Sequence, residues 1–372
     1  MSLADFPKVT VITVVRDLIK FKRKEFFLQC LESVHEQTYP NIEHIIIDGA
    51  STDGTLDLLK EYAATGWIEY YSEPDNGIYY AMNKGICKST GKYINFLNSD
   101  DYFCDTFGLE RSVELLEDSG AVFSYSKVYF SHNGEKISLM PNKIERFFFN
   151  MPFCHQGTLM RKDALVNEGM FDTGLKSASD YDLLIRLIIK GCNCIPIDII
   201  FTVFRGGGFS SEYKSLSDGE CQKIQKKYFP MMESKRKRSY GLEYTEHYIT
   251  KDQLENIKSS VNEEISKRIS ELKTKKLTDG RLRINSGAYF DFLIKRYYFC
   301  GIIPILTLKQ RTILYAKSEK IWSLGGARIF RIRETRYNKV YFFLNIPIFM
   351  VAHNHGSSFW NYLRKFIATL KK

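Results

Sequence analysis

The sequence predicts an α/β protein with a Rossmann-like, mostly parallel central sheet flanked by helices, and an additional C-terminal region of helix and strand. Two observations predict this class. Between residues 8 and 130, short β-branched apolar runs alternate with stretches of helical spacing, which is the pattern of βαβ units. Acidic residues also follow three successive predicted strands, and parallel sheets bind their ligands at those strand ends.

The predicted elements follow one another without long gaps. Strands are expected at 9–15, 42–50, 67–73 and 92–101, and helices at 25–37, 56–64, 77–88 and 107–120. Mixed β structure is expected from 120 to 160, then a helix over 177–191 and a strand over 193–205. The three glycines at 206–208 predict a loop, because glycine holds no regular element. No internal repeat of about 20 to 50 residues is visible.

Acidic side chains stand at three successive strand ends. Asp48 closes the second predicted strand, Asp75 follows the third, and Asp100 and Asp101 follow the fourth. Helix capping alone explains one such acid but explains three in a row less easily. Asn98 projects from the same side of its strand as Asp100 and suits a ribose hydroxyl. The neighbouring Asp101 falls on the opposite side, where a structural role is expected.

Several enzyme classes lack their signatures here. The first predicted strand is followed by no GxGxxG, and no GxxxxGK[ST] or GxSxG occurs. A nucleotidyltransferase would need a Gly/Arg-rich phosphate loop near the N-terminus, which is absent. Eight scattered cysteines without a CxxC pair indicate reduced thiols rather than a zinc site. The N-terminus has no signal-peptide pattern, and no apolar run reaches the roughly 18 residues of a membrane span.

Charge divides the chain unevenly. Residues 231–372 contain 28 Lys and Arg against 12 Asp and Glu, within a chain whose net charge is +10. We expect a basic linker and an amphipathic helix over 231–280, and a basic, aromatic-rich region over 281–372. This composition favours an anionic membrane surface. Nucleic acid is the rival partner, but no recognition motif for it is present. The 250–277 stripe of apolar residues fits docking on the body or a homodimer.

Five motifs in order resemble inverting glycosyltransferases of family 2, which have the GT-A fold, and within them the bacterial branch that builds surface polysaccharides. They are IIIDGASTDGT, SEPDNGIYYAMNKGI, TGKYINFLNSDDYF, HQGTLMRKDAL and ASDYDLLIRL, spread over residues 8–215. The resemblance implies a nucleotide-sugar donor, a divalent cation (Mn²⁺ or Mg²⁺) and direct displacement at the anomeric carbon. It therefore implies a catalytic domain over 1–230.

The same resemblance implies roles for individual residues. Asp100, in the position of the DxD motif, would hold the cation, and Asp180 would be the general base. The nucleotide-sugar would contact Thr13, Val15, Arg16, Asp48, Asp75, Lys84, Asn98, Ser99 and Asp100. Gly49 and Asn98 stand where many relatives carry acids, and Ser179 stands where they carry Glu. From the residues alone, Asp180 fits a base in the first turn of a helix, where an acid also stabilises the helix dipole.

Three further residues are assigned to the donor or acceptor pocket. His155 and Gln156 end an apolar segment, and a buried hydrogen-bonded histidine is the alternative. Arg205 precedes the glycine loop, which is expected either to close over bound diphosphate or to be a plain flexible loop. Lys84 is assigned to phosphate contact, with a solvated helix charge as the alternative.

The resulting hypothesis is a metal-dependent, inverting transferase that adds one sugar to a glycan or lipid-linked acceptor from a UDP-sugar. Single addition is favoured because no QxxRW signature occurs. We expect a cytoplasmic protein, peripheral at the inner face of the cell membrane. The alternative is a catalytically inactive nucleotide-sugar-binding or scaffold protein of the same fold.

Overall fold

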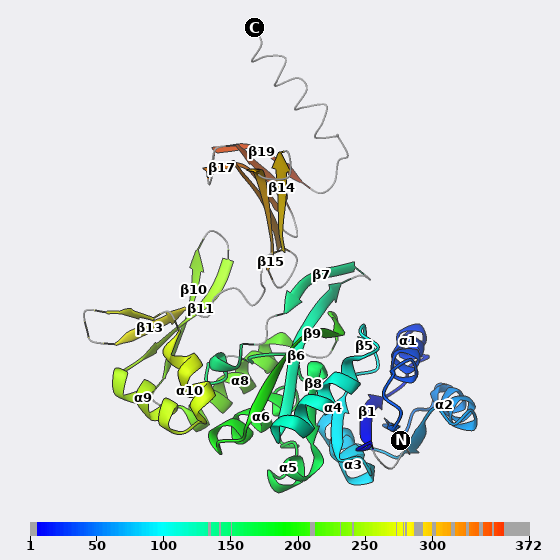
Figure 1. The fold of residues 1–372 in the computed structure, drawn as a ribbon. Helices are drawn as coiled ribbons and strands as arrows, with labels where there is room; N and C mark the ends of the chain where they lie inside the picture. The colour runs from blue at the N-terminus through cyan, green and yellow to red at the C-terminus, as the bar shows by residue number, and fades with distance from the viewer. Residues whose placement is uncertain are drawn as a thin grey trace. The chain divides into compact units, whose positions relative to one another are not determined.

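The computed structural model describes residues 6–132, 135–140, 143–149, 151–208, 213–230, 232–239, 242–272, 274–277, 279 and 281–285, and six strands between 293 and 352. The chain divides into two compact units, Met1–Gly287 and Ala288–Lys372 (Figure 1). Residues 231–280, expected as a separate linker and helix, lie within the first unit. The sequence also predicts a short basic amphipathic helix in FWNYLRKFIATLKK, 359–372, which lies outside the described residues.

The central sheet of the first unit contains nine strands among the described residues. They are β1 (Val9–Val15), β2 (Ile42–Asp48), β3 (Glu69–Ser72), β4 (Tyr93–Phe96), β5 (Tyr102–Phe103), β6 (Phe123–His132), β7 (Glu135–Met140), β8 (Thr158–Arg161) and β9 (Cys194–Arg205). The helices that accompany them are α1 (Lys24–His35), α2 (Thr55–Ala64), α3 (Ile78–Lys88), α4 (Gly108–Ser119), α5 (Lys162–Asn167), α6 (Ser179–Ile189) and α8 (Lys214–Tyr228).

The sheet has the order β3-β2-β1-β4-β8-β6-β9-β5, and β7 forms a hairpin with β6. Its first four strands are mutually parallel. β8 is antiparallel to β4 and to β6, whereas β9 runs parallel to β6. The predicted α/β class with a Rossmann-like parallel sheet is therefore confirmed, and the sheet becomes mixed beyond β4.

Helices cover both faces of the sheet. Val9 and Val11 of β1 pack with residues of α1 and α4, whereas Ile12 packs into the core beside α3 and α6. Alternate residues of a strand point to opposite faces, so an uninterrupted apolar run is buried on both sides. This explains why the β1 and β2 sequences are continuous apolar runs rather than alternating ones.

Residues 231–280 differ from their prediction in two ways. The basic stretch expected as a linker forms strand β10 (Glu233–Ser239), which pairs with β11 (Leu242–Ile249). The single expected helix is divided into α9 (Lys251–Ser259) and α10 (Glu263–Ser270). The first helix has Ser260 as its C-cap. Asn262 caps the second, since its side chain accepts a hydrogen bond from the Ile265 amide.

The apolar stripe of α9 and α10 packs on the body of the first unit. Leu254, Ile257, Ile265 and Ile269 are buried and belong to the main core. β11 and the short strands β12 (Thr274–Lys276) and β13 (Leu282–Asn285) complete a small four-stranded sheet within the described residues. Docking on the body, one of the two roles expected for the stripe, is therefore the one observed.

The second unit is an antiparallel meander of six strands among its described residues. They are β14 (Leu293–Phe299), β15 (Ile303–Ile313), β16 (Lys317–Leu324), β17 (Ala327–Glu334), β18 (Asn338–Phe343) and β19 (Ile346–Ala352). Each of its three successive hairpins has a register shift near the turn, which leaves Ile305, Ile329 or Ile348 without an opposite residue. The unit is thus a threefold repeat of one bulged hairpin, which inspection of the sequence missed.

Helix lengths bear on the expected absence of a membrane span. In the part of the chain that the structure describes, no helix combines the length and the apolar composition needed to cross a bilayer.

Candidate active site

The candidate site lies where three neighbouring parallel strands end. β1 and β2 end in register, with Val15 opposite Asp48. β4 ends at Phe96, beside Ile12 of β1. The segments that leave these strands therefore gather at one edge of the sheet, as expected for an α/β fold.

Asp48 is fully buried at this edge. Its carboxylate accepts hydrogen bonds from the Ser51 amide at 2.9 Å and the Ser72 hydroxyl at 2.6 Å, and a further one from the Ser51 hydroxyl. These bonds join the loop after β2 to the end of β3. In this structure Asp48 therefore fixes the shape of the edge.

The predicted residues of β1 lie at different depths. The Thr13 hydroxyl is buried and lies 3.0 Å from His44 Nε2. Burial lowers the pKa of His44 to about 3, so that imidazole is neutral. Val15 packs in the core between α1 and α2. Of the assigned residues in this strand and its exit, Arg16 alone has an exposed side chain.

Gly49 makes room for Asp75. A Cβ atom added at Gly49 would lie 2.7 Å from Asp75 Oδ2 and 3.3 Å from Arg16 Cδ. The other carboxylate oxygen of Asp75 accepts a hydrogen bond from the Gly77 amide at 3.0 Å. The Asp75 carboxylate thus occupies the space that a side chain at position 49 would need.

Lys84 lies in the second turn of α3. Its ammonium group donates to the Pro74 carbonyl at 2.9 Å and forms an ion pair with Glu73 at 3.1 Å. The lysine thus holds the segment that carries Asp75. Both residues assigned to the diphosphate side belong to one short, internally bonded stretch.

Asp100 lies beside two arginines. Arg23 Nη1 is 3.2 Å from Asp100 Oδ2, and the Arg205 guanidinium donates to the Asp100 carbonyl. Burial raises the pKa of the Asp100 carboxyl, an effect that the positive charges of Arg23 and Arg205 oppose. The Arg205 guanidinium also lies 4.6 Å from the centre of the Phe26 ring and 4.7 Å from that of Tyr102. Arg205 is therefore held in place rather than free to swing.

Asp101 has the structural role that the sequence predicts. Its buried carboxylate accepts hydrogen bonds from the Arg205 amide at 2.8 Å, Gln156 Nε2 at 2.9 Å and Asn98 Nδ2 at 3.3 Å. Burial, followed by the negative charge of Asp100, raises the pKa of Asp101 well above its usual range. The assigned Gln156 lies behind the edge, and its side chain supports Asp101. Ser99, which lies between Asn98 and Asp100, is also buried.

Asn98 supplies an unsatisfied acceptor. Its Oδ1 atom is buried and, within the described residues, has no hydrogen-bond partner. Orphaned buried acceptors are rare and call for a ligand, ion or water. With Asp100 it provides two oxygens, whereas no group of three His, Cys, Asp or Glu side chains suited to a metal occurs in the described part of the chain. These two oxygens would be the protein's ligands to a divalent cation, whose remaining ligands would come from a bound diphosphate, as is common for Mg²⁺.

Asp180 lies in the first turn of α6, as predicted, and Ala178 precedes the helix as its N-cap. Asp180 Oδ2 is 3.0 Å from His155 Nδ1, and Oδ1 accepts from the Tyr79 hydroxyl at 3.3 Å. Because a carboxylate only accepts, His155 Nδ1 must carry the proton. Burial, and next the Asp180 charge, raise the pKa of Tyr79 well above its usual range, so Tyr79 stays a donor.

One short turn links the two halves of the site. The 3₁₀ helix His155–Gly157 places His155 against Asp180 and the next residue, Gln156, against Asp101. Consecutive residues thus connect the helix that carries Asp180 to the turn that carries Asp100. The Asp180 side chain stays 20% exposed, so a ligand can still reach it.

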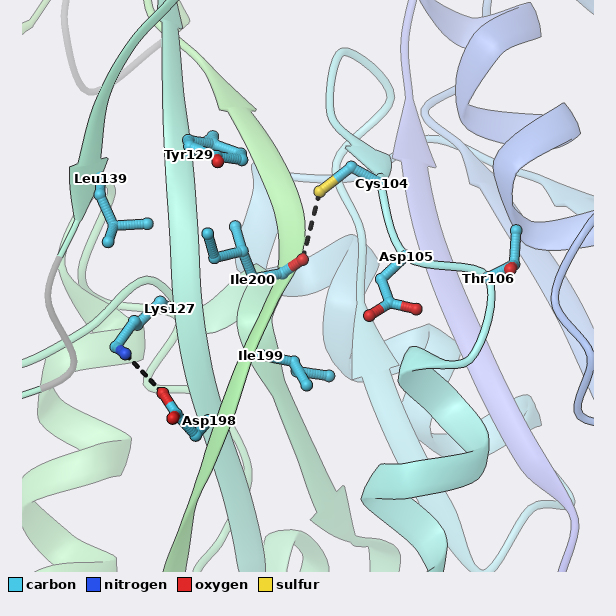
Figure 2. A pocket seen from close by; sticks show the side chains of 9 residues that line it. All are labelled: Cys104, Asp105, Thr106, Lys127, Tyr129, Leu139, Asp198, Ile199 and Ile200. Atoms are coloured by element: carbon cyan, nitrogen blue, oxygen red, sulfur yellow. Dashed lines mark hydrogen bonds and ion pairs between the residues drawn. The ribbon is translucent and has the colours of Figure 1, made fainter. Parts of the chain in front are cut away.

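The groove shown in Figure 2 is separate from these residues. It has a volume of about 610 Å³ and is lined by the segment after β5 and by residues of β6, β7 and β9. The Lys127–Asp198 ion pair, 2.5 Å long, crosses it, and the Cys104 thiol donates to the Ile200 carbonyl at 3.3 Å. None of the residues assigned from the sequence lines this groove.

Sequence reasoning missed two contributors to the site. Tyr79 lies inside a quoted motif, so its position carried a signal that was not used. Arg23 lies in a charged stretch, FKRKEF, with nothing to single it out. Its contact with Asp100 spans 77 positions of the sequence and becomes visible only in the fold.

Comparisons with known proteins find similarity to glycosyltransferases. The family model described as Glycosyl transferase family 2 matches residues 18–172. An uncharacterized glycosyltransferase of Rickettsia bellii (strain RML369-C) is 32% identical over 191 residues, which cover 48% of this chain and 26% of that protein. A PGL/p-HBAD biosynthesis glycosyltransferase of Mycobacterium bovis is 28% identical over 169 residues, which cover 42% of this chain and 62% of that protein. The chain therefore spans less than two thirds of both relatives.

Two solved structures are similar in fold. The mannosyltransferase PcManGT from Pyrobaculum calidifontis, in complex with GDP-Man and Mn²⁺, has a TM-score of 0.48 and 18% identity, covering 60% of this chain and 64% of that one. S. aureus TarS 1–349 has a TM-score of 0.47 and 14% identity, covering 76% of this chain and 99% of that one.

Proposed function

We propose that this chain, whose residues 18–172 belong to glycosyl transferase family 2, is an inverting glycosyltransferase. It would move one sugar from a nucleotide-sugar to a hydroxyl group of a glycan or lipid-linked acceptor. The two relatives described above are named glycosyltransferases, and the chain spans only part of each. The proposal therefore relies on the geometry of the site.

The observation that carries the proposal is the turn at His155–Gly157. It brings a partly exposed carboxylate, oriented by two donors, to the same edge as a second acid and an unsatisfied amide oxygen. Transfer with inversion needs a base near the acceptor hydroxyl and a separate group that holds the leaving diphosphate. Asp180 and the Asn98–Asp100 turn supply these two parts.

On the acceptor side, Asp180 takes the proton of the attacking hydroxyl as its oxygen bonds to the anomeric carbon. The bond from that carbon to the diphosphate breaks in the same step, and the nucleoside diphosphate leaves with the electron pair. His155 and Tyr79 act through Asp180, since their hydrogen bonds fix its carboxylate plane. Such positioning lowers the barrier because the base needs no reorientation.

On the donor side, Asp100 would hold a divalent cation. Asn98 Oδ1 would either contact the same cation or accept a hydrogen bond from a ribose hydroxyl. A bound cation would neutralise charge on the departing diphosphate. Arg23, which now pairs with Asp100, lies where it can turn toward the same phosphate oxygens. Arg16, Asp75 and Lys84 would border the nucleotide.

The direct test is release of nucleoside diphosphate from a panel of sugar nucleotides, each with Mn²⁺ or Mg²⁺. A UDP-sugar is the expected donor, because the family resemblance favours it. Release that depends on both cation and an acceptor supports the proposal. If no donor is bound or turned over, the chain is better described as an inactive relative or scaffold protein.

Two substitutions separate the roles. Asp180→Asn should abolish turnover and leave donor binding intact, because the amide keeps the shape but cannot take a proton. Asp100→Ala should weaken binding of both cation and donor. Asp57→Asn, an exposed acid of α2, is the matched control and should change neither. Turnover by Asp180→Asn, or cation-dependent turnover by Asp100→Ala, would contradict these assignments.

We further propose that the enzyme works in bacterial surface-polysaccharide synthesis, at the cytoplasmic face of the cell membrane. The basic charge of residues 231–372 supports contact with anionic lipid. The same region leaves a homodimer open. The purified chain should bind anionic vesicles at low salt, and failure to do so would exclude the membrane location.

A further inference from the structure

The loop between β1 and α1, residues 16–23, presents apolar side chains to solvent. Ile19 is 39% exposed and Phe21 is 58% exposed. The neighbouring Leu18, by contrast, is buried in the core beside α1 and α2. The loop is thus anchored through one apolar residue while two others point outward, where water contact is unfavourable.

This loop has a fixed shape. The Asp17 and Leu18 amides donate to the side chains of Ser51 and Thr55 at 2.7 and 2.8 Å. Asp17 and Lys22 adopt positive φ angles of 49° and 54°, which are uncommon for residues other than glycine. A loop held by such bonds in an unfavourable backbone conformation cannot simply fold its apolar side chains away.

Lysines alternate with the exposed apolar residues of this loop. Lys20, Lys22 and Lys24 are all exposed. Within the described residues none of the three takes part in an ion pair, and Lys20 Nζ lies 5.5 Å from the centre of the Phe21 ring. Exposed apolar residues that alternate with lysines along a loop are the pattern of a membrane-interface contact.

We propose that the β1–α1 loop docks on an anionic lipid surface, with Ile19 and Phe21 inserted at the headgroup boundary and the lysines on lipid phosphates. This contact is distinct from the one proposed for residues 231–372. An acidic protein or a nucleic acid would use the lysines but has less use for an exposed aliphatic side chain. Arg23, at the end of the same loop, contacts Asp100, so the docked loop would bring the site to the lipid surface.

The test measures lipid binding of the full-length chain directly, so it holds whether or not transferase activity is found. Sedimentation with vesicles of phosphatidylcholine, with and without phosphatidylglycerol, compares wild type with two double variants. Ile19→Ser with Phe21→Ser should weaken binding to the anionic vesicles about tenfold. Lys20→Glu with Lys24→Glu should weaken it similarly and flatten its dependence on salt. Lys22 is left unchanged because of its backbone conformation.

The chain offers matched controls. Phe107, 48% exposed at the start of α4, is replaced by Ser, and the exposed Lys223 of α8 is replaced by Glu. Both should bind vesicles as wild type does, and thermal melting should show that all variants fold. Vesicle binding unchanged in both loop variants would overturn the proposal. So would a Phe21 effect confined to nucleotide affinity, which would place the ring in the donor site, or binding of nucleic acid in preference to vesicles.

Discussion

His155 Nδ1 donates a hydrogen bond to Asp180 Oδ2 over 3.0 Å, and both side chains are about four-fifths buried. The other ring nitrogen, Nε2, is buried and has no partner within the described residues. The imidazole therefore holds the Asp180 carboxylate through Nδ1, whereas its orphaned Nε2, like Asn98 Oδ1, calls for a ligand or water.

Replacing His155 tests that task. His155→Ala should lower kcat by about tenfold to a hundredfold while donor KM stays near that of wild type, because the base loses its orientation. His155→Asn can place an amide N–H close to the Nδ1 position and should recover part of the rate. The pH dependence of kcat, measured for all three proteins, should shift only where the bond is lost. Equal defects in the Ala and Asn variants would contradict a positioning role.

Removing Arg23 should strengthen cation binding. Arg23 and a divalent cation compete for Asp100, so Arg23→Gln should tighten the apparent Kd for Mn²⁺ by roughly twofold to fivefold, the range expected of a partly exposed ion pair. Electron paramagnetic resonance of free Mn²⁺, with nucleoside diphosphate present, measures this directly. Arg111→Gln, which removes the similar Arg111–Asp105 pair, is the control. Weaker Mn²⁺ binding by Arg23→Gln would show that Arg23 assists the cation through the diphosphate.

Introducing an acid at position 49 should lower the stability of the fold and weaken donor binding. In Gly49→Asp the new Cβ would approach Asp75 Oδ2 to 2.7 Å and add a second negative charge beside it. We expect the free energy of unfolding to fall by about 1–3 kcal/mol and donor KM to rise. Gly49→Asp combined with Asp75→Asn relieves the repulsion and should recover stability. Urea denaturation of the three proteins distinguishes these outcomes, and an unaffected Gly49→Asp would mean that Asp75 moves freely.

Acid should destabilise the fold through two buried histidines. Burial lowers the pKa of His44 to about 3 and that of His247 to about 4, from about 6.5 when unfolded. The unfolded chain therefore binds protons more readily, so their stabilisation is full above about pH 6.5 and is lost as the pH falls toward the folded values. Each histidine lowers the free energy of unfolding by at most about 1.4 kcal/mol per pH unit in that window.

His44→Gln should flatten this acid dependence while keeping a donor near Thr13. Urea denaturation at a series of pH values measures the slope, and substitution of the exposed His35 by Gln is the control. A slope that is the same in wild type and His44→Gln would show that His44 does not contribute.

Local sequence determined the elements of the first unit. Continuous apolar runs identified β1 and β2, and acids placed directly after strands identified the edge where Asp48 and Asp100 lie. The position of Asp180 in the first turn of its helix was also predictable, because helical spacing continues from that residue. These features depend on neighbours in the chain, which is why periodicity finds them.

The C-terminal half was less predictable. The basic stretch at β10 is a strand rather than a linker, because its pairing with β11 outweighs its polar composition. The three bulged hairpins of the second unit escaped notice because their shared feature is an unpaired isoleucine, which is a property of register and not of composition.

The sequence by itself determined which residues stand at the carboxyl ends of the parallel strands and which helix carries Asp180. Only the tertiary structure decided how they meet. Arg23 reaches Asp100 across 77 positions, and His155 reaches Asp180 across 25. Such contacts depend on the order in which strands pair and on the space left by residues such as Gly49. Neither the strand order nor that space is written in local spacing, because both arise from the packing of segments that are distant in the chain.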